Sequence, residues 1–380
     1  MTPAAAPPAP ARPAALARTR SWLNALPPWR WRVLGLAAGL GLPLLFSRPD
    51  LPLSPDWTRH FRLHFEQVMQ QKIDDLGFDY AAHYPSNTNE AKRNGRLLVP
   101  VVARLTGAGV TGVHVFCLVM QGVLMAALLL AGERAAGDRL AALAATLAVA
   151  GTSVGTAVWS DIALWCDNCA FAFITLALVI RRPLAAGVCL VLAMFVDERA
   201  LLAVPLVILF HRFTASPRST AWAAAATVPA YALLRLGLMQ LPAGGLPLAN
   251  VATRALVAHN LEVAPFGFWF ALEGGWCLVV PALAALGGAS QVRRALGVVA
   301  ATVLPMTAAL GVGDFSRSAS YAFAATFVAL AALRPAVAPD RLARFALVAA
   351  IVSLVVPNIS VMTVVVAEPS PLAELLARWL

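Results

Sequence analysis

Long apolar segments recur along almost the whole of this 380-residue chain, and they constrain the fold more than any short motif does. After a first segment at 33–46, they lie at 98–131, 140–158, 162–180, 184–196, 200–211, 220–241, 263–288, 296–312, 319–333 and 345–366. The pattern predicts an all-α polytopic membrane protein with about 11 transmembrane helices, since one crossing needs about 20 apolar residues. Several segments are shorter than about 17 residues, so we expect some helices to be broken or to line a water-filled recess.

The composition excludes a water-soluble protein. Apolar residues make up 60% of the chain and charged residues 13%, whereas soluble domains are about half apolar and about a quarter charged. The five cysteines are an odd number and lie mostly within apolar segments, so they indicate no disulfide framework. The net charge of +10 comes from basic residues that we assign to membrane topology, and we expect no nucleic-acid partner.

The distribution of polar stretches predicts the order of the parts. We expect a disordered cytoplasmic tail at 1–20, a first span at 21–47, an extracytoplasmic loop at 48–97, a multi-span domain at 98–366 and an extracytoplasmic tail at 367–380. The first span has no small-x-small cleavage site, which favours an uncleaved helix over a signal peptide. Within the loop, Phe65, Val68 and Met69 recur at helical spacing and predict an amphipathic helix on the membrane surface.

Arginine is segregated along the chain, and this predicts the orientation. With the N-terminus inside, the inward segments are 1–32, 133–139, 181–183, 211–219, 289–295 and 334–344. Each of them carries arginine and none carries lysine, while Glu133, Asp138 and Asp340 are their only acids. This is the bias that the positive-inside rule describes, so the N-terminus is predicted to be cytoplasmic.

The acidic residues collect in the outward turns, where they lie beside scarce cations. Ionisable groups at membrane depth are costly, so they usually line a site or pair with each other. Capping of helix ends by aspartate is the simpler alternative for each turn taken alone. Because three such turns carry acids, we expect a functional cavity open to the outside. The turns hold Asp161 and Asp167, then Asp197, Glu198 and Arg199, and finally Asp314 and Arg317.

Other reactive residues give weaker signals. Arg235 and Glu273 lie within apolar segments, and a salt bridge between their helices is the expected use. Cys166 and Cys169 have redox spacing without the strand context of thioredoxin-like sites. No phosphate-binding glycine loop, zinc motif or nucleophile elbow occurs, so nothing supports nucleotide-driven or serine-hydrolase chemistry.

Five short motifs occur one after another between residues 48 and 335. They are Asp79-Tyr80, the stretch 96–100 (Arg-Leu-Leu-Val-Pro), Ser160-Asp161, the acidic turn 197–202 and the pair Asp314 and Arg317. In this order the chain resembles the GT-C-type polytopic membrane glycosyltransferases. The resemblance implies transfer of a sugar from a polyprenyl-phosphate donor to an envelope acceptor at the outer face of the bacterial cytoplasmic (inner) membrane. It also implies an acidic catalytic residue in the first outer loop, best matched by Asp79, with Asp74 and Asp75 as rivals.

Such a transfer needs a carboxylate to take the proton of the acceptor hydroxyl and cations to stabilise the departing phosphate. We expect Asp79 to be the general base and Arg199 and Arg317 to bind the phosphate. The other expected substrate-binding residues are Tyr80, Arg96, Asp161, Asp197, Glu198 and Asp314. No cofactor is required by the spacing, although the acids could hold a divalent cation such as Mg²⁺ or Mn²⁺.

Two other classes of protein fit the same chain. A secondary transporter or lipid flippase would do no covalent chemistry, but such folds usually contain paired repeats and midplane charges, and neither is evident here. A membrane scaffold would use its outer charges only to set topology. The expected partners are therefore membrane lipid and a polyprenyl-phosphate-linked sugar.

Overall fold

A computed structural model of the chain describes residues 14–46, 55–85, 90, 93–94, 96–160, 164–238, 253–356, 359–361 and 365–367. Within them the chain is helical almost throughout, which confirms the all-α class. The one pair of strands in these ranges is an antiparallel hairpin of β1 (Ile359–Val361) and β2 (Val365–Ala367).

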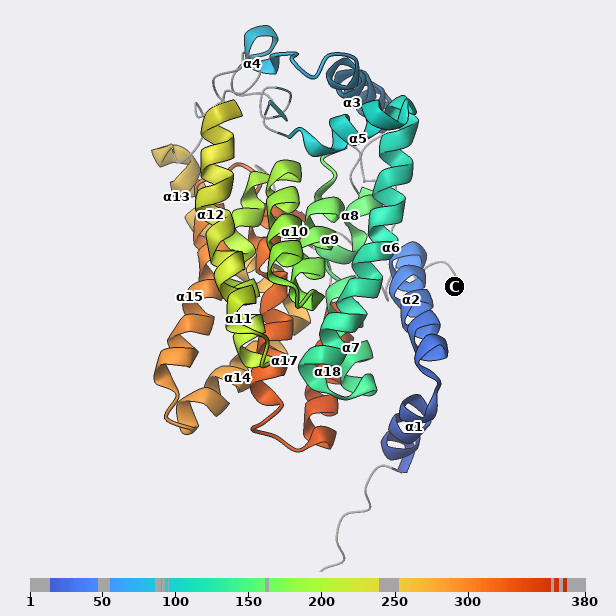
Figure 1. Ribbon diagram of the computed structural model, residues 1–380, viewed down its shortest axis with the longest axis vertical. Helices are drawn as coiled ribbons and strands as arrows, with labels where there is room; N and C mark the ends of the chain where they lie inside the picture. The colour runs from blue at the N-terminus through green and yellow to red at the C-terminus, as the bar shows by residue number, and fades with distance from the viewer. Residues whose placement is uncertain are drawn as a thin grey trace, which may run out of the picture.

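The helices pack roughly along the long axis of the molecule (Figure 1). They are α1 (Ala14–Ala25), α2 (Pro28–Phe46), α3 (Pro55–Asp74), α4 (Tyr80–His83), α5 (Leu98–Thr106), α6 (Gly109–Ala136), α7 (Arg139–Ala150), α8 (Ser153–Ser160), α9 (Asp167–Val179), α10 (Pro183–Val196), α11 (Val204–Phe213), α12 (Arg218–Leu238), α13 (Arg254–Phe270), α14 (Trp276–Gly288), α15 (Val292–Ala309), α16 (Phe315–Ala319), α17 (Ala325–Leu333) and α18 (Pro339–Val355). Short 3₁₀ turns lie at η2 (Glu198–Ala203), η4 (Glu273–Gly275) and η5 (Ser320–Ala324).

Small residues let the central helices approach closely. Every residue of α17 is buried, and α7 is built largely of alanine. A methyl group at Gly132 of α6 would lie 2.9 Å from the carbonyl oxygen of Ala142 in α7. Such contacts replace the bulky interdigitation of a soluble core and are typical of helices that pack within a membrane. On the periphery Leu233 and Leu296 are 70% and 62% exposed, as expected of side chains that face lipid.

Fewer helices can cross a membrane alone than the hydropathy pattern predicts. In the described ranges α6, α12 and α15 are long and apolar enough, and α13 with η4 and α14 qualifies as a fourth only as a pair bent by 74°. The expectation of about 11 continuous spans is therefore not supported. The reason is helix length, because α7, α9 and α10 contain 12, 13 and 14 residues and reach only about 18–21 Å, against about 30 Å of hydrocarbon.

Two apolar segments are interrupted where they were expected to be continuous. The segment 98–131 breaks at Gly107, whose φ of +66° ends α5 before α6 begins. Within the segment 345–366, α18 ends at Val355, and the described residues Ile359–Val361 form β1, which pairs with β2. Hydropathy alone does not register either break, because both sides of each break are apolar.

The N-terminal segment is more ordered than its composition indicates. Residues 1–13 lie outside the described ranges, but α1 begins at Ala14, within the segment expected to be disordered. Arg20 gives the reason, because its guanidinium pairs with Asp138 at 2.6 Å and with Asp340 at 2.5 Å. The C-terminal tail beyond residue 367 lies outside the described ranges.

The arginine-bearing segments gather at one end of the bundle, which we call the arginine-rich end. Arg20 joins α1 to the turns that begin α7 and α18. Arg134 Nη1 donates to the carbonyl of Leu178 at 2.6 Å, and Thr220 Oγ1 donates to the carbonyl of Arg181 at 2.8 Å. The helices α3, α4 and α5 lie at the opposite end (Figure 1). The arginines that are segregated along the sequence therefore also lie together in space, at one end of the bundle.

The bend between α13 and α14 depends on a glycine. A methyl group at Gly274 would lie 1.8 Å from the carbonyl oxygen of Ala349 in α18, so Gly274→Ala must push η4 off that helix. We expect a loss of roughly 1–3 kcal/mol of unfolding free energy, seen as a lower thermal midpoint of the purified protein in detergent. Gly287→Ala is the control, because a methyl group there meets nothing within 4 Å. Equal midpoints for the two variants would contradict the close approach.

Candidate functional site

Charged side chains from four distant segments meet at the end opposite the arginine-rich end. We call this set the charge cluster. Its members come from the residue pair before α5, the start of α9, the turn into η2 and the start of α16. They are Arg96, Asp167, Asp197, Glu198, Arg199, Asp314 and Arg317.

Local chain geometry places the acids. Asp197 is extended (φ −149°) and ends α10, and its Oδ1 accepts a hydrogen bond from the backbone N–H of Arg199 at 2.9 Å, which caps η2. Asp314 caps α16 in the same way by accepting the backbone N–H of Arg317 at 3.3 Å. Both aspartates therefore cap helix ends, as the simpler alternative predicted. Both carboxylates also bind arginine side chains.

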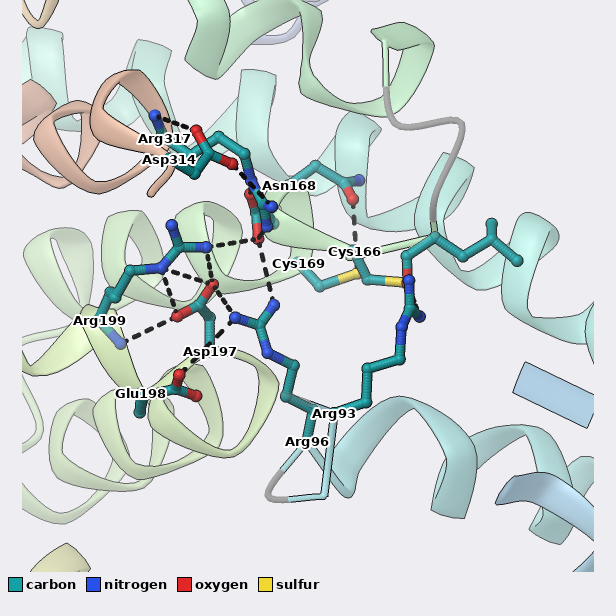
Figure 2. Close-up of polar contacts among 12 residues, drawn as sticks. Arg93, Arg96, Cys166, Asn168, Cys169, Asp197, Glu198, Arg199, Asp314 and Arg317 are labelled. Carbon is teal, nitrogen blue, oxygen red and sulfur yellow. Dashed lines mark hydrogen bonds and ion pairs between the residues drawn. The ribbon is translucent and has the colours of Figure 1, made fainter. Parts of the chain in front are cut away.

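Asp197 is the centre of the cluster. Its side chain is 0% exposed, and Figure 2 shows Arg96 and Arg199 reaching it from opposite sides. Arg199 Nη2 and Arg96 Nη2 lie 2.5 Å and 3.0 Å from Oδ2. Burial on its own would raise the pKa of Asp197, but the charges of Arg199 and Arg96 outweigh it and hold the pKa well below its ordinary value. The carboxylate in this turn is therefore ionised.

Asp167 connects Arg317 at the start of α16 with Arg96 and Arg199, the two arginines that bind Asp197. Arg317 binds it in a bidentate manner, with Nε 2.6 Å from Oδ2 and Nη2 2.8 Å from Oδ1. Arg199 and Arg96 approach the same carboxylate at 3.6 Å and 3.8 Å. Arg317 also binds Asp314 at 3.0 Å. Two carboxylates thus bind three guanidinium groups, and Asp167 is paired with an arginine from each of the other three segments.

An aromatic ring organises the guanidinium groups. The ring centroid of Trp165 lies 4.4 Å from Arg93, 4.7 Å from Arg96 and 4.6 Å from Arg317. Leu164 and Cys166 on either side of it have φ values of +51° and +59°, a conformation that non-glycine residues rarely adopt. Sequence reasoning missed Trp165 because neither hydropathy nor charge pattern reports a backbone turn of this kind.

A small cavity of about 20 Å³ adjoins the cluster. It is enough for one water molecule. Three of its lining residues are cations, namely Lys72, Arg93 and Arg96, and none is an acid. Lys72 Nζ donates to the carbonyl of Phe78 at 2.7 Å, and burial lowers the pKa of Lys72 to about 8 against a smaller opposing effect of nearby acids. Lys72 and Arg93 were not predicted as site residues.

Asp79 and Tyr80, both predicted site residues, lie beside this cavity and outside the charge cluster. Asn94 connects them, because its Nδ2 donates to Asp79 Oδ1 at 2.7 Å and its Oδ1 accepts the backbone N–H of Tyr80 at 2.8 Å. Tyr80 lines the cavity, but its hydroxyl donates to the carbonyl of Val68 at 2.5 Å. The tyrosine hydroxyl therefore has a structural partner, whereas the Asp79 carboxylate is half-buried at the edge of the site.

The other predicted acids do not join the cluster. Asp74 accepts a hydrogen bond from Gln70 Nε2 at 2.7 Å, and Asp75 accepts the backbone N–H of Gly77 at 2.8 Å. Both are exposed and make local contacts at the end of α3. Asp161, which we expected in the site, lies outside the described residues.

Neither a metal site nor the expected buried salt bridge is found in the described part of the chain. No group of three or more metal-binding side chains occurs there, and the carboxylates of Asp167 and Asp197 are held by arginines. Arg235 and Glu273 are buried as expected, but no ion pair joins them in the residues described, so that pairing was wrong. Of the two cysteines with redox spacing, Cys169 contacts a third cysteine, because its Sγ lies 3.8 Å from Cys117 Sγ of α6.

Searches against models of known protein families, curated proteins and solved structures each returned no match. Function is therefore inferred from the charge cluster, its cavity and the residues around them.

Removing the charge of Asp197 should destabilise the protein strongly. Asp197→Asn leaves Arg199 and Arg96 without their buried partner, a change that costs about 3–5 kcal/mol in comparable sites. Glu198→Gln is the matched control, because its side chain is 40% exposed and should contribute less than about 1 kcal/mol. Thermal unfolding in detergent measures both. The double variant Asp197→Asn/Arg199→Met should recover part of the loss, and losses that simply add would contradict the pairing.

Lys72 should make stability depend on pH. Its pKa falls from 10.5 to about 8 on burial, so between these pH values the unfolded chain binds a proton that the folded protein does not. The free energy of unfolding therefore rises with pH in this window. The thermal midpoint of the wild type minus that of Lys72→Met should increase from pH 7.5 to 10. Gln71→Met, an exposed neighbour on α3, serves as control, and a constant difference for Lys72→Met would contradict the shift.

Proposed function

We propose that this protein is a glycosyltransferase of the bacterial inner membrane that moves a sugar from a polyprenyl-phosphate donor to an envelope acceptor at the extracytoplasmic face. The observation that supports it most is the cavity lined by Lys72, Arg93 and Arg96 without any acid, beside the turn that carries Asp79. A phosphate needs clustered cations, and a hydroxyl acceptor needs a carboxylate nearby.

The donor phosphate is assigned to the cavity side of Arg96. This guanidinium uses Nη2 on Asp197, whereas its buried Nε and Nη1 hydrogen-bond to no group in the described residues. Nε can donate to a phosphate oxygen, whereas Nη1 also lies 3.8 Å from Asp167 Oδ1. Arg199 and Arg317, which we expected to bind phosphate, are engaged by Asp197 and Asp167. Their proposed role is to position Arg96 through those carboxylates.

The chemical step uses Asp79 as the base. The acceptor hydroxyl oxygen attacks the anomeric carbon of the sugar, and its proton passes to the Asp79 carboxylate. The bond between that carbon and the phosphate oxygen breaks, and the polyprenyl phosphate leaves with the electron pair. Lys72, Arg93 and Arg96 stabilise the charge on the leaving phosphate. Asn94 holds Asp79 in place by its hydrogen bond at 2.7 Å.

The mechanism requires the site to open. A cavity of about 20 Å³ accepts a water molecule and excludes a sugar, for which pockets of about 300 Å³ or more are usual. One way to open it would be to separate α3 and α4 from the end of α10, since these elements contribute the lining residues Lys72, Tyr80 and Val196. Closure around the donor would then exclude water from the reacting centre.

The proposed topology follows from the two ends of the bundle. The arginine-rich end is assigned to the cytoplasm together with the N-terminus, and the charge cluster to the opposite face. Beyond the four spans that meet the length criterion, we propose that short elements in series complete further crossings. Examples are α7 with α8, η2 with α11, and η5 with α17.

A transporter or lipid flippase is the second candidate. The bent pair α13 and α14 favours it, because Glu273 lies buried at the bend with a φ of +45°. Broken helices with a buried ionisable group are typical of transport sites.

Replacing Asp79 tests the enzyme proposal directly. Purified protein in liposomes is supplied with labelled polyprenyl-phosphate hexoses and pentoses and an envelope acceptor extract. Asp79→Asn should lower transfer about 100-fold or more, in keeping with the contribution of a general base. Asp74→Asn, exposed at the end of α3 and in contact with Gln70, should leave transfer unchanged. If Asp79→Asn transferred sugar at the wild-type rate, Asp79 would not be the general base. Movement of intact donor across the bilayer without sugar transfer would favour the flippase.

A further inference from the structure

A large cavity lies at the arginine-rich end, away from the charge cluster. Its volume is about 670 Å³, and we call it the basic pocket. It forms where α11 ends and where α12 and α15 begin. The helix α11 separates it from Asp197, and ten residues of helix span about 15 Å. The basic pocket is therefore distinct from the proposed catalytic site.

Four arginines line the basic pocket without counter-charge. They are Arg212, Arg218, Arg293 and Arg294, and no acid is among the lining residues. None of the ion pairs in the described ranges involves any of the four. Arg294 donates to Gln291 Oε1 at 2.7 Å, which is a neutral partner. Like charges gathered in this way repel one another, so an anion between them would be stabilised.

Helix direction adds to the positive potential. The N-termini of α12 and α15 both face the basic pocket through Arg218 and Arg293, and helix N-termini favour anions. The C-terminus of α11 opposes them, but two N-termini outweigh one C-terminus. Arg134 helps to fix the wall, because it donates to the carbonyl of Leu178 at 2.6 Å and also to Ser216 Oγ.

Part of the remaining wall is apolar and reaches the exposed surface of the helices. Leu209, Phe213 and Trp222 line the basic pocket, and Trp222 is 69% exposed. One turn along α15 from Arg293, Leu296 is 62% exposed. An exposed tryptophan beside arginines is typical of the headgroup level of a membrane, with acyl chains on one side and water on the other. A free phosphate would use the arginines alone, whereas a phospholipid would use both walls.

We propose that the basic pocket binds the headgroup of an anionic phospholipid, with its phosphodiester between the arginines of α11, α12 and α15 and its acyl chains along Trp222 and Leu296. Bound there, the lipid joins three helices whose arginines otherwise repel. This site goes beyond sugar transfer and does not depend on it, so it can stand if the enzyme proposal fails.

The test titrates delipidated, full-length protein in neutral detergent with dioleoyl phosphatidylglycerol and counts bound lipid by native mass spectrometry. Arg293→Gln/Arg294→Gln should weaken binding about 10- to 30-fold, in keeping with the usual contribution of each arginine near an anionic headgroup. Arg341→Gln/Arg344→Gln is the matched control, because these exposed arginines lie at the same end outside the basic pocket. It should change binding less than twofold. Phosphatidylcholine should bind the wild type at least tenfold more weakly than phosphatidylglycerol.

Three results would overturn the proposal. Equal weakening by both pairs of substitutions would show general attraction to surface charge, and equal binding of phosphatidylcholine would show that the arginines are not used. Full competition by inorganic phosphate at millimolar concentration would assign the site to a free anion instead of a lipid. If Arg293→Gln/Arg294→Gln fails to elute as a single species, Arg212→Gln/Arg218→Gln removes two charges from the other wall and must give the same loss.

Discussion

The sharing of three arginines by two buried carboxylates holds together the end of the bundle that carries the proposed site. Asp167 and Asp197 are each in contact with Arg96 and Arg199, so breaking one pair disturbs the other. An unmatched charge in such surroundings costs about 3–5 kcal/mol, a large part of the stability of an ordinary domain. This constraint accounts for the broken helices nearby. The chain must leave the helical conformation at Asp197 to place a carboxylate between two guanidinium groups, so α10 ends there and η2 intervenes before α11.

The same residue type behaves differently at the two ends of the molecule because of what surrounds it. In the charge cluster four acids accompany three arginines, and geometry rather than net charge decides which N–H groups remain available. In the basic pocket no acid lies among the lining residues, and apolar side chains such as Leu209, Phe213 and Trp222 adjoin the arginines. The cluster therefore gives rigidity and orientation, whereas the basic pocket gives unbalanced charge that a ligand can neutralise. Counting arginines along the sequence predicts which segments gather at one end of the bundle, but it does not distinguish these two roles.

The sequence predicted the all-α class, the segregation of arginine and several cluster residues, because charges in an apolar chain are rare and stand out. Asp197, Glu198, Arg199, Asp314 and Arg317 were found in this way, whereas Arg96 was predicted from the resemblance to a known family. Continuity of helices was not predictable, since hydropathy averages over breaks such as Gly107 and the bend before η4. Pairing failed for Arg235 and Glu273 because it depends on how two helices are rotated about their axes. Trp165 was missed because its position depends on a turn with positive φ values. Lys72 was missed because its role depends on burial of one side of α3. Neither feature can be recognised from composition.

The proposed placement of the donor phosphate rests on the balance of charge. A phosphate placed among Arg199 and Arg317 would have to displace carboxylates already within 2.5–2.6 Å of those guanidinium groups. On the other side of Arg96 it would meet Lys72 and Arg93 with no acid in the cavity wall. Lys72, with a pKa of about 8, is mostly protonated at pH 7 and contributes its charge there. A phosphate would stabilise that charged form further, because an anion opposes the desolvation that lowers the pKa. Donor binding and protonation of Lys72 would therefore reinforce each other, and loss of the phosphate as product would again favour release of the proton.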